Sequence, residues 1–465
     1  MQEDTIAAIS TPIGEGAISI IRLSGPESIS IVNGIFKTPD NHGLIEAASH
    51  TIHYGHIVDP EDNSIIDEVL VNIMRAPRTY TREDIVEING HGGGVPLRRI
   101  LELVMRGGCR LAEPGEFTKK AFLNGRIDLA QAEAVIDIIR AKTDLGSRVA
   151  LSHLKGSLSK EIEEIGDEII DIVAAIEVAI DFPEDDLEDV DISNITDDLL
   201  GISKRLSHLL DTADSGRILR QGLKTAIIGK PNVGKSSLLN LILRESRAIV
   251  TEIPGTTRDI IQETVNIKDV PLILLDTAGL RETGELVERL GIERTLEALE
   301  EAELILYVVD SSTELTSEDH DILDRSVNKD VIVVLNKIDL PSITTKETIR
   351  DLLKEKGRDL PIVQISAKNR SGLEDLERVI LEEVFKGKSL SGAQDLIMLN
   401  VRQKDLLERG IKRLNEGLDG IERGLPADII ALELKAVGRI LSEITGKFID
   451  EEIIDRIFSQ FCVGK

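Results

Sequence analysis

Residues 225–243 read TAIIGKPNVGKSSLLNLIL, which is a short apolar stretch, a glycine-containing turn and a helical stretch. The turn, from Gly229 to Ser236, matches the pattern G-x-x-x-x-G-K-[ST], in which glycines let backbone amides face phosphate oxygens. A helix that begins directly after the turn adds the positive end of its dipole. Lys235 would reach the β- and γ-phosphates, and the hydroxyl of Ser236 would bind Mg²⁺. We therefore expect a nucleoside triphosphate site at the end of a buried strand.

Three further motifs follow predicted strands in the same region. They are Asp276-Thr277-Ala278-Gly279 after residues 272–275, Asn336-Lys337-Ile338-Asp339 after residues 331–335, and Ser366-Ala367-Lys368 after residues 362–365. The carboxylate of Asp339 can accept hydrogen bonds from the ring N–H and the exocyclic amine of guanine, a pair of donors that adenine lacks on that edge. Asp276 can hold magnesium through water, and the amide of Gly279 can meet the γ-phosphate. The four motifs predict a GTP site at the carboxyl ends of strands, where doubly wound sheets bind ligands.

The region around these motifs alternates short apolar stretches with amphipathic helical ones. The predicted strands are residues 225–228, 263–267, 272–275, 304–309, 331–335 and 362–365. This alternation is typical of a mostly parallel sheet that helices cover. With its motifs, the stretch 223–384 resembles the Ras-like GTPase superfamily, which implies GTP and Mg²⁺ binding.

Two features depart from the common pattern of that superfamily. First, Leu280 stands where a Ras-type protein has the Gln that orients the attacking water, so another group must position the water or supply charge. Thr257, in the loop before the next strand, keeps the common role as the candidate Mg²⁺ ligand that senses the γ-phosphate. Second, Asn232, inside the turn, could hold K⁺ together with backbone carbonyls and so replace an arginine finger, or it could only stabilise the turn.

Composition excludes several classes of protein. The chain has 465 residues and a net charge of −28, so a nucleic acid partner would need a local basic patch. Aromatic residues make up 2% and there is no Trp, which argues against a base-stacking platform. Two cysteines cannot form a disulfide framework. Acidic residues near the start do not suit a signal peptide, and the longest apolar runs are about six residues, so we expect a cytoplasmic protein with no membrane partner.

The pattern along the chain predicts four consecutive regions. They are residues 1–120, mixed α/β; 121–217, helical; 218–386, α/β with the GTP motifs; and 387–465, helical. The simplest organisation is one helical domain, discontinuous in sequence, into which the α/β domain is inserted. A domain tolerates such an insertion when the ends of the inserted piece lie close together.

Some elements outside the GTP motifs can also be predicted. Residues 17–23 and 69–74 are short and β-branched, which favours strands. Apolar residues recur at steps of three and four from Leu151 to Ile180, which predicts one long amphipathic helix. Phe182-Pro183 would end this helix.

Several longer stretches, one of which extends a GTP motif, are more specific. They are GHGG at 90–93, GEFTKKAFLNGRIDLAQAEAV at 115–135, GTTRD at 255–259, DTAGLRET at 276–283 and FCVGK at 461–465. With these stretches the chain resembles, over essentially its whole length, the MnmE (TrmE) family of tRNA modification GTPases. The resemblance implies an N-terminal α/β domain that binds tetrahydrofolate and dimerises, a discontinuous all-α helical domain, and an inserted Ras-like P-loop GTPase domain.

The resemblance also implies an activity and partners. The expected protein is a potassium-stimulated, GTP-hydrolysing component of a complex that modifies carbon 5 of the wobble uridine, position 34, of certain tRNAs. The group added is aminomethyl or carboxymethylaminomethyl. The expected assembly is a homodimer that joins the FAD-containing MnmG (GidA) in a heterotetramer.

For folate, the resemblance implies a site made from both ends of the chain. Its residues are Arg22, Glu87, Arg126 and Lys465, and its ligand is 5-formyl- or methylene-tetrahydrofolate. A carboxylate at Glu87 suits the donors of the pterin, and the cations suit its glutamate tail. Without the resemblance, Glu87 would be taken for a solvated strand residue. Cys462 is given a catalytic role, although it could be only a small buried hydrophobe.

For GTP, the resemblance gives catalytic roles to Glu288, which organises the attacking water, and to Arg281. The expected K⁺ ligands are Asn232, Thr251, Ile253 and Thr256. The expected GTP-binding residues are Asn232, Val233, Gly234, Lys235, Ser236, Ser237, Thr251, Glu252, Ile253, Pro254, Gly255, Thr256, Thr257, Asp276, Thr277, Ala278, Gly279, Asn336, Lys337, Asp339, Ser366, Ala367 and Lys368.

A GTPase switch in ribosome assembly is the alternative function. Related GTPases with a similar turn and GTTRD do that work, and they usually carry an RNA-binding domain with a basic surface. This chain is acidic and has an upstream α/β region and a cysteine near residue 465 instead. Those features favour the tRNA modification hypothesis.

Overall fold

The computed structural model describes residues 4–12, 14–40, 42–181, 192–245, 248–249, 263–275, 299–385 and 397–464. The chain forms two compact units. Unit 1 comprises Met1–Ile136, His153–Ile192 and Glu416–Lys465, and unit 2 comprises Asp137–Ser152 and Ser193–Asn415. Each unit is therefore assembled from stretches that are separated in sequence.

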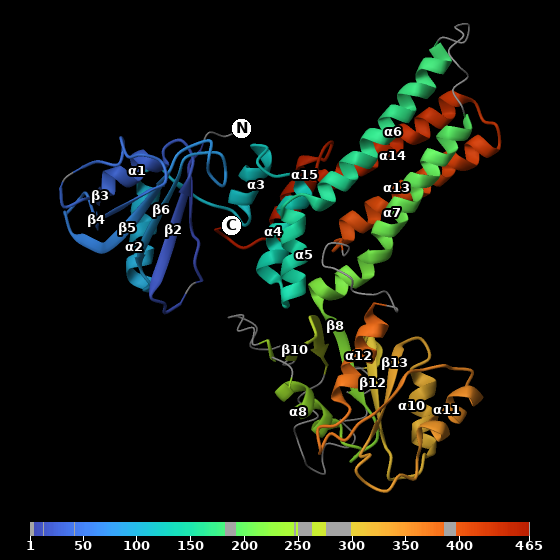
Figure 1. The fold of residues 1–465 in the computed structure, drawn as a ribbon. Helices are drawn as coiled ribbons and strands as arrows, with labels where there is room; N and C mark the ends of the chain where they lie inside the picture. Colours follow the sequence, from blue (N-terminus) through green and yellow to red (C-terminus); the bar gives the residue numbers. More distant parts are fainter. Residues whose placement is uncertain are drawn as a thin grey trace. The chain divides into compact units, whose positions relative to one another are not determined.

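Unit 1 contains a seven-stranded sheet (Figure 1). In spatial order its strands are β3 (Phe36–Lys37), β4 (Thr51–Val58), β5 (Ile65–Met74), β6 (Ile85–His91), β2 (Ile18–Ser24), β1 (Ile6–Ile9) and β7 (Arg110–Leu111). Neighbouring strands are antiparallel, except for the parallel pair β1 and β7. The strands predicted at 17–23 and 69–74 are confirmed as β2 and part of β5.

The two faces of this sheet differ. Helices α1 (Ser28–Ile35) and α2 (Gly94–Arg106) share a buried core with alternate residues of β5, which are Val69, Val71 and Ile73. The opposite face carries Ile52, Tyr54 and Leu70, whose side chains are 67%, 49% and 46% exposed. Within the described chain, this part of the sheet therefore keeps an uncovered apolar face.

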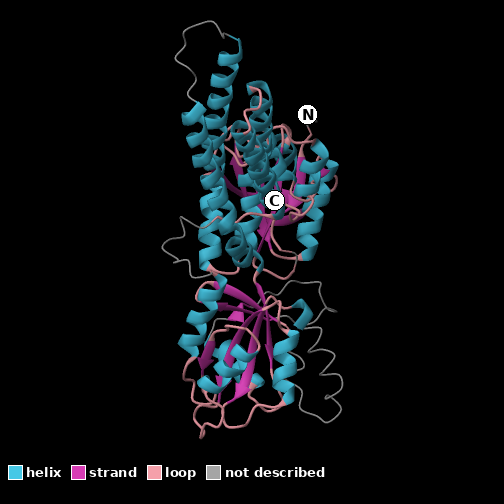
Figure 2. Ribbon diagram, turned by 90° about the vertical axis from the view of Figure 1, so that its right-hand side faces the viewer, coloured by secondary structure: helices cyan, strands magenta, loops and turns pink. Residues whose placement is uncertain are grey.

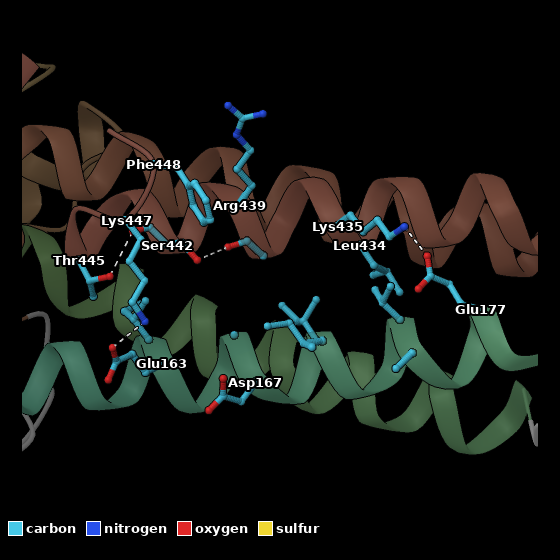
Figure 3. A pocket seen from close by; sticks show the side chains of 17 residues that line it. Glu163, Asp167, Glu177, Leu434, Lys435, Arg439, Ser442, Thr445, Lys447 and Phe448 are labelled. Atoms are coloured by element: carbon cyan, nitrogen blue, oxygen red, sulfur yellow. Dashed lines mark hydrogen bonds and ion pairs between the residues drawn. The ribbon is translucent and has the colours of Figure 1, made fainter. Parts of the chain in front are cut away.

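Helices form the rest of unit 1. They are α3 (Glu116–Leu123), α6 (Ser157–Asp181), α14 (Ala427–Thr445), α15 (Glu451–Phe458) and the adjoining parts of α4 (Leu129–Arg140) and α13 (Val401–Glu422). Helix α6 contacts α14, and the apolar side chains of Ile169 and Leu434 are buried. Two ion pairs link α6 to this segment, Glu177 with Lys435 of α14 and Glu163 with Lys447, two residues beyond its end, at 3.0 Å. Between these pairs runs a groove of about 720 Å³ (Figure 3).

One helix prediction is wrong. The periodic pattern from Leu151 to Ile180 predicts a single helix, but the structure has α5 (Asp144–Leu154) followed by α6. Gly156, between them, has a φ of +92°, a left-handed conformation that ends a right-handed helix. The apolar spacing continues across this break, so periodicity alone could not reveal it.

Unit 2 is built on a second seven-stranded sheet. In spatial order its strands are β14 (Ile362–Gln364), β13 (Asp330–Asn336), β12 (Leu304–Asp310), β8 (Leu223–Ile228), β11 (Val270–Leu274), β10 (Glu263–Ile267) and β9 (Ala248–Ile249). The strands from β14 to β11 are parallel, and β10 and β9 are added antiparallel. All six strands predicted in this region are confirmed, with ends that shift by up to two residues.

Helices cover both faces of the unit 2 sheet (Figure 2). One core contains residues of α8 (Lys235–Glu245) and α12 (Leu373–Val384), and the other contains residues of α10 (Ser317–Arg325) and α11 (Lys346–Glu355). Leu145 of α5 and Leu219 of α7 (Ile192–Gln221) extend the first core. The predicted doubly wound α/β fold of this region is thereby confirmed.

Among the described residues, no helix has the length and apolar character needed to cross a bilayer.

Candidate functional site

The glycine-containing turn joins the end of β8 to the start of α8. Asn232 and Gly234 have φ angles of +62° and +102°, which bend the turn around its own backbone. A Cβ atom at Gly234 would lie 2.2 Å from the side-chain nitrogen of Asn336, so only glycine fits there. Because α8 begins at Lys235, the first amides of the helix face the same turn, as an anion site requires.

Lys235 lies on the inner side of this turn. Its Nζ donates hydrogen bonds to the backbone oxygens of Gly229 at 2.8 Å and Lys230 at 2.7 Å. An ammonium group has three N–H donors, so one is left for a phosphate oxygen. Burial lowers the pKa of Lys235, and an anionic ligand would offset this effect by favouring the charged form.

Asn336 connects three of the predicted motifs. It is 1% exposed, at the end of β13. Its Nδ2 donates to the carbonyl oxygen of Val233 at 2.9 Å, and its Oδ1 accepts from the amide of Ala367 at 3.1 Å. The phosphate turn and the two loops expected to meet the base are therefore held together by one buried side chain.

The neighbouring Lys337 strengthens the same connection. Its Nζ donates to the backbone oxygen of Asn232 at 2.6 Å and pairs with Asp310 at 2.6 Å. Lys337 has a φ of +64°, which directs its side chain across the turn. Sequence reasoning did not single out Asp310, because no motif includes it and it contributes from a different strand, β12.

Asp339 is exposed at the end of this site. One of its oxygens accepts a hydrogen bond from the hydroxyl of Ser366 at 2.5 Å. That hydrogen bond is the main cause that lowers the pKa of Asp339, so the carboxylate is charged at neutral pH. A charged acceptor beside the loop of Ser366 and Ala367 is the arrangement expected for reading the guanine edge.

Thirteen predicted residues of the GTP site lie outside the described residues, whereas Ser236 and Ser237 lie in α8 and Lys368 is exposed. The thirteen are Thr251, Glu252, Ile253, Pro254, Gly255, Thr256, Thr257, Asp276, Thr277, Ala278, Gly279, Arg281 and Glu288. Their roles stay predictions. The described part holds Asn232 and Ser236, the candidates for K⁺ and Mg²⁺ on the turn itself, and a hydroxyl and an amide oxygen suit these hard cations.

A second cluster of predicted residues lies in unit 1. Arg22 of β2 and Glu87 of β6 are paired across the sheet, and their side chains are joined at 2.8 Å. Both side chains are about one-fifth exposed, at 21% and 19%. Arg22 also donates to the carbonyl oxygen of Gly464 at 3.2 Å, and so does the hydroxyl of Ser10. Residues far apart in sequence thus meet at one place on the sheet.

Arg126 lies near the same place. Its guanidinium is 4.7 Å from the centre of the Tyr80 ring and donates to the Tyr80 backbone oxygen at 3.3 Å. The guanidinium of Arg22 is 5.7 Å from the centre of the Phe117 ring. Tyr80 and Phe117 shape this cluster. Although Phe117 lies in the stretch 115–135, no sequence signal linked either ring to its cationic partner, because the partners come from distant segments.

Of the two predicted site residues in the FCVGK stretch, the structure describes Cys462 but not Lys465. Cys462 is exposed, which excludes the alternative of a small buried hydrophobe. By contrast, Cys109 is buried, and burial raises the pKa of its thiol to about 12. Of the two thiols, that of Cys462 is the accessible one.

Known proteins match the chain along its length. The family described as "MnmE helical domain" matches residues 129–462, and the family described as "GTP-binding protein TrmE N-terminus" matches residues 5–126. The tRNA modification GTPase MnmE of Thermoanaerobacter pseudethanolicus is 52% identical over 462 residues, which cover 99% of both chains. That of Alkaliphilus oremlandii is 49% identical over 463 residues, which cover 100% of this chain and 99% of the relative.

Solved structures match part of the chain. A crystal structure of Era from Aquifex aeolicus is 32% identical, with a TM-score of 0.28, and the match covers 41% of this chain and 66% of that one. The full-length relatives, together with the two family matches, leave one assignment: the chain belongs to the MnmE family of tRNA modification GTPases.

Proposed function

We propose that the chain is the GTP-hydrolysing component of a complex that modifies carbon 5 of the wobble uridine, position 34, of certain tRNAs. The observation that carries the proposal is full-length identity of about one-half with tRNA modification GTPases. The hydrogen-bonded junction at Asn336, which holds the phosphate turn and the base loops together, supports GTP as the nucleotide. The group added to uridine would be aminomethyl or carboxymethylaminomethyl.

In this proposal, the described residues bind and orient GTP. Lys235 and the first amides of α8 hold the β- and γ-phosphates, and Asp339 holds the guanine. The hydroxyls of Ser236 and Thr257 would hold Mg²⁺, which would supply positive charge to the phosphate oxygens. Because Asp276 and Thr257 would both sense the γ-phosphate, their loops can respond to hydrolysis.

The chain would complete its catalytic site with K⁺ and Glu288. Leu280 has no polar group to orient water, so we assign this part to Glu288 and a further catalytic role to Arg281. Asn232, Thr251, Ile253 and Thr256 would supply oxygen ligands to K⁺. We expect GTP turnover to be faster in KCl than in NaCl or CsCl at equal ionic strength, and equal rates would contradict the K⁺ site.

The cluster around Arg22 and Glu87 is the proposed folate site. Among the described residues, Oε2 of Glu87 has one contact, with Nδ2 of Asn72 at 3.5 Å, so it can also accept from the pterin amine. Arg126 and Lys465 would bind the glutamate tail of 5-formyl- or methylene-tetrahydrofolate. Exposed Cys462, near the same end of the chain, would contribute to the one-carbon chemistry.

The uncovered sheet face of unit 1 supports a homodimer. Strand register places Ile52, Asn72, Glu87 and Arg22 in one row, so the exposed apolar residues share a face with the folate cluster. A second copy laid on Ile52 and Leu70 would remove apolar surface from water and enclose that cluster. The FAD-containing MnmG (GidA), in a heterotetramer in the cytoplasm, and tRNA are the further partners that we propose.

Modification of tRNA in a deletion strain tests the proposed function. Wild-type chain should restore the modified wobble uridine, measured by mass spectrometry of tRNA nucleosides. Glu288→Ala should keep GTP affinity, slow turnover and lower the modified uridine in parallel. If turnover collapses while modification stays normal, the GTPase cycle does not drive modification. Restored ribosome assembly without restored uridine modification would favour the ribosome-assembly alternative.

A further inference from the structure

Lys230, within the glycine-containing turn, forms an ion pair with Asp319, and neither residue is among the predicted site residues. Lys230 occupies a position that the pattern G-x-x-x-x-G-K-[ST] leaves unspecified. Its Nζ lies 2.6 Å from a carboxylate oxygen of Asp319, in helix α10. The two side chains are 14% and 1% exposed, so the pair is shielded from water.

Asp319 is held in place from two directions. Its Oδ1 accepts a hydrogen bond from the hydroxyl of Tyr307 at 2.6 Å, and Tyr307 is a buried residue of β12. Its Oδ2 accepts from the amide of Thr316 at 2.7 Å, which caps the start of α10. A buried carboxylate with these partners is a fixed anchor, because moving it would leave several polar groups unpaired.

Asp319 holds Lys230, and the backbone oxygen of Lys230 accepts a hydrogen bond from Lys235. While the Lys230 side chain is tied to Asp319, its backbone oxygen accepts from Nζ of Lys235 at 2.7 Å. Lys230 precedes Pro231, which restricts it to extended backbone angles. The other acceptor of Lys235, the oxygen of Gly229, is also confined, because a Cβ at Gly229 would lie 2.3 Å from the oxygen of Val308.

We infer that Asp319 is a positioning residue for GTP binding, which acts through Lys230 to hold the ammonium of Lys235 where it meets the phosphates. This inference rests on the proposed phosphate-binding role of Lys235. The buried pair Lys230–Asp319 fixes one of the two carbonyl oxygens that orient the ammonium. Without Asp319, the Lys230 side chain keeps, among the described residues, one longer hydrogen bond, from Nζ to the Thr316 hydroxyl at 3.2 Å. Residue 230 is then held less firmly, and the third N–H of Lys235 loses its fixed direction.

Two substitutions in the full chain test this inference. Lys230→Met keeps the apolar stem and removes the charge, and Lys230→Arg restores the charge. We expect Lys230→Met to weaken GTP and GDP binding about tenfold, and Lys230→Arg to recover most of the loss. Guanosine, which has no phosphate, should bind both variants within about twofold of the wild type. Titration calorimetry with the three ligands measures these affinities.

Asp319→Asn removes the same ion pair from the other side. The double variant Lys230→Met, Asp319→Asn should bind GTP and GDP no more weakly than the weaker of the two single variants. A matched control is Lys356→Met, because Lys356 pairs with Asp324 of the same helix, away from the turn. This control should leave all three affinities unchanged. Equal weakening of guanosine and GTP by Lys230→Met would overturn the inference, because it would indicate a general loss of structure.

Lys235→Ala separates this inference from the proposed function. If Lys235→Ala abolishes GTP binding while Lys230→Met and Asp319→Asn leave it unchanged, the positioning role is wrong and the phosphate site stands. If Lys235→Ala leaves GTP affinity unchanged, the proposed site fails and the inference fails with it. Thermal unfolding of each variant identifies those that do not fold, and Lys230→Met, compared with its rescue Lys230→Arg, remains informative if Asp319→Asn is one of them.

Discussion

Gly464 links the FCVGK stretch to the sheet of unit 1, and Gly464→Ala should undo that link. Gly464 has a φ of +91°, and a Cβ there would lie 2.5 Å from the backbone oxygen of Ile9. Its carbonyl oxygen accepts hydrogen bonds from Arg22 and Ser10. A methyl group would therefore push the backbone away from β1 and stretch both hydrogen bonds.

The free-energy cost of Gly464→Ala can be estimated from these contacts. Placing alanine in a left-handed conformation costs about 1–2 kcal/mol. Loss of the two hydrogen bonds at the Gly464 carbonyl adds about 1 kcal/mol each. The docked position of residue 464 is then less favourable by about 3–4 kcal/mol, a factor of roughly 10² to 10³ in its equilibrium. Because Lys465 follows directly in sequence, its proposed contact with folate would weaken to the same extent.

Calorimetry with 5-formyl-tetrahydrofolate measures the consequence. The Gly464→Ala chain should bind this ligand at least about tenfold more weakly than the wild type. Gly424→Ala is the matched control, because Gly424 also has a positive φ, +66°, but a Cβ there meets no atom within 4 Å. The control should lose stability and keep its folate affinity. Wild-type affinity in Gly464→Ala would refute the idea that the FCVGK stretch completes the folate site.

Three further predictions concern single residues. Asp339→Asn replaces an acceptor with a donor, so competition binding should show GTP affinity about tenfold lower or worse and a gain for xanthosine triphosphate; unchanged discrimination would refute the guanine contact. Gly234→Ala should lower GTP affinity and melting temperature because its Cβ would displace the Asn336 amide, whereas Gly201→Ala, with open space in α7, should raise stability by up to about 1 kcal/mol. Burial lowers the pKa of His153 from 6.5 to about 4. Between these two values the unfolded chain binds more protons than the folded chain. The free energy of unfolding therefore has its full value above pH 6.5 and falls by up to about 3 kcal/mol as the pH drops to 4. Urea unfolding at pH 7.5 and 5 should show a smaller pH effect for His153→Leu, and an equal effect would exclude His153 as its source.

The parallel sheet of unit 2 was the more predictable one. Its strands are buried on both faces, so strands such as β12 and β13 are continuous apolar runs that stand out in the sequence. In unit 1, β4 and β5 keep one uncovered face that carries both apolar and polar residues. Their alternation is diluted by exposed Ile52 and Leu70, and β4 and β6 were not predicted.

The candidate sites, like the two sheets, contain a part that the sequence predicts and a part that it does not. Lys235, Asn336 and Asp339 are found from sequence because spacing within a motif fixes their chemistry. The partners that hold them, such as Asp310 and Asp319, come from other strands and helices, and no local spacing reports such pairs. Arg22 and Glu87 were identified only through family resemblance, because register across two strands, not sequence separation, joins them.

The contact between α6 and α14 has a consequence for the order of synthesis. Helix α6 leaves the ribosome well before α14, and all of Ser193–Asn415 in unit 2 is made in between. Unit 2 can complete its sheet during this interval, while the apolar stripe of α6, with Ile169 and Val173, still lacks its partner. Contacts that close over so long a stretch form late. The nascent chain should therefore bind nucleotide before unit 1 is complete, and α6 is the segment that a chaperone would have to shield.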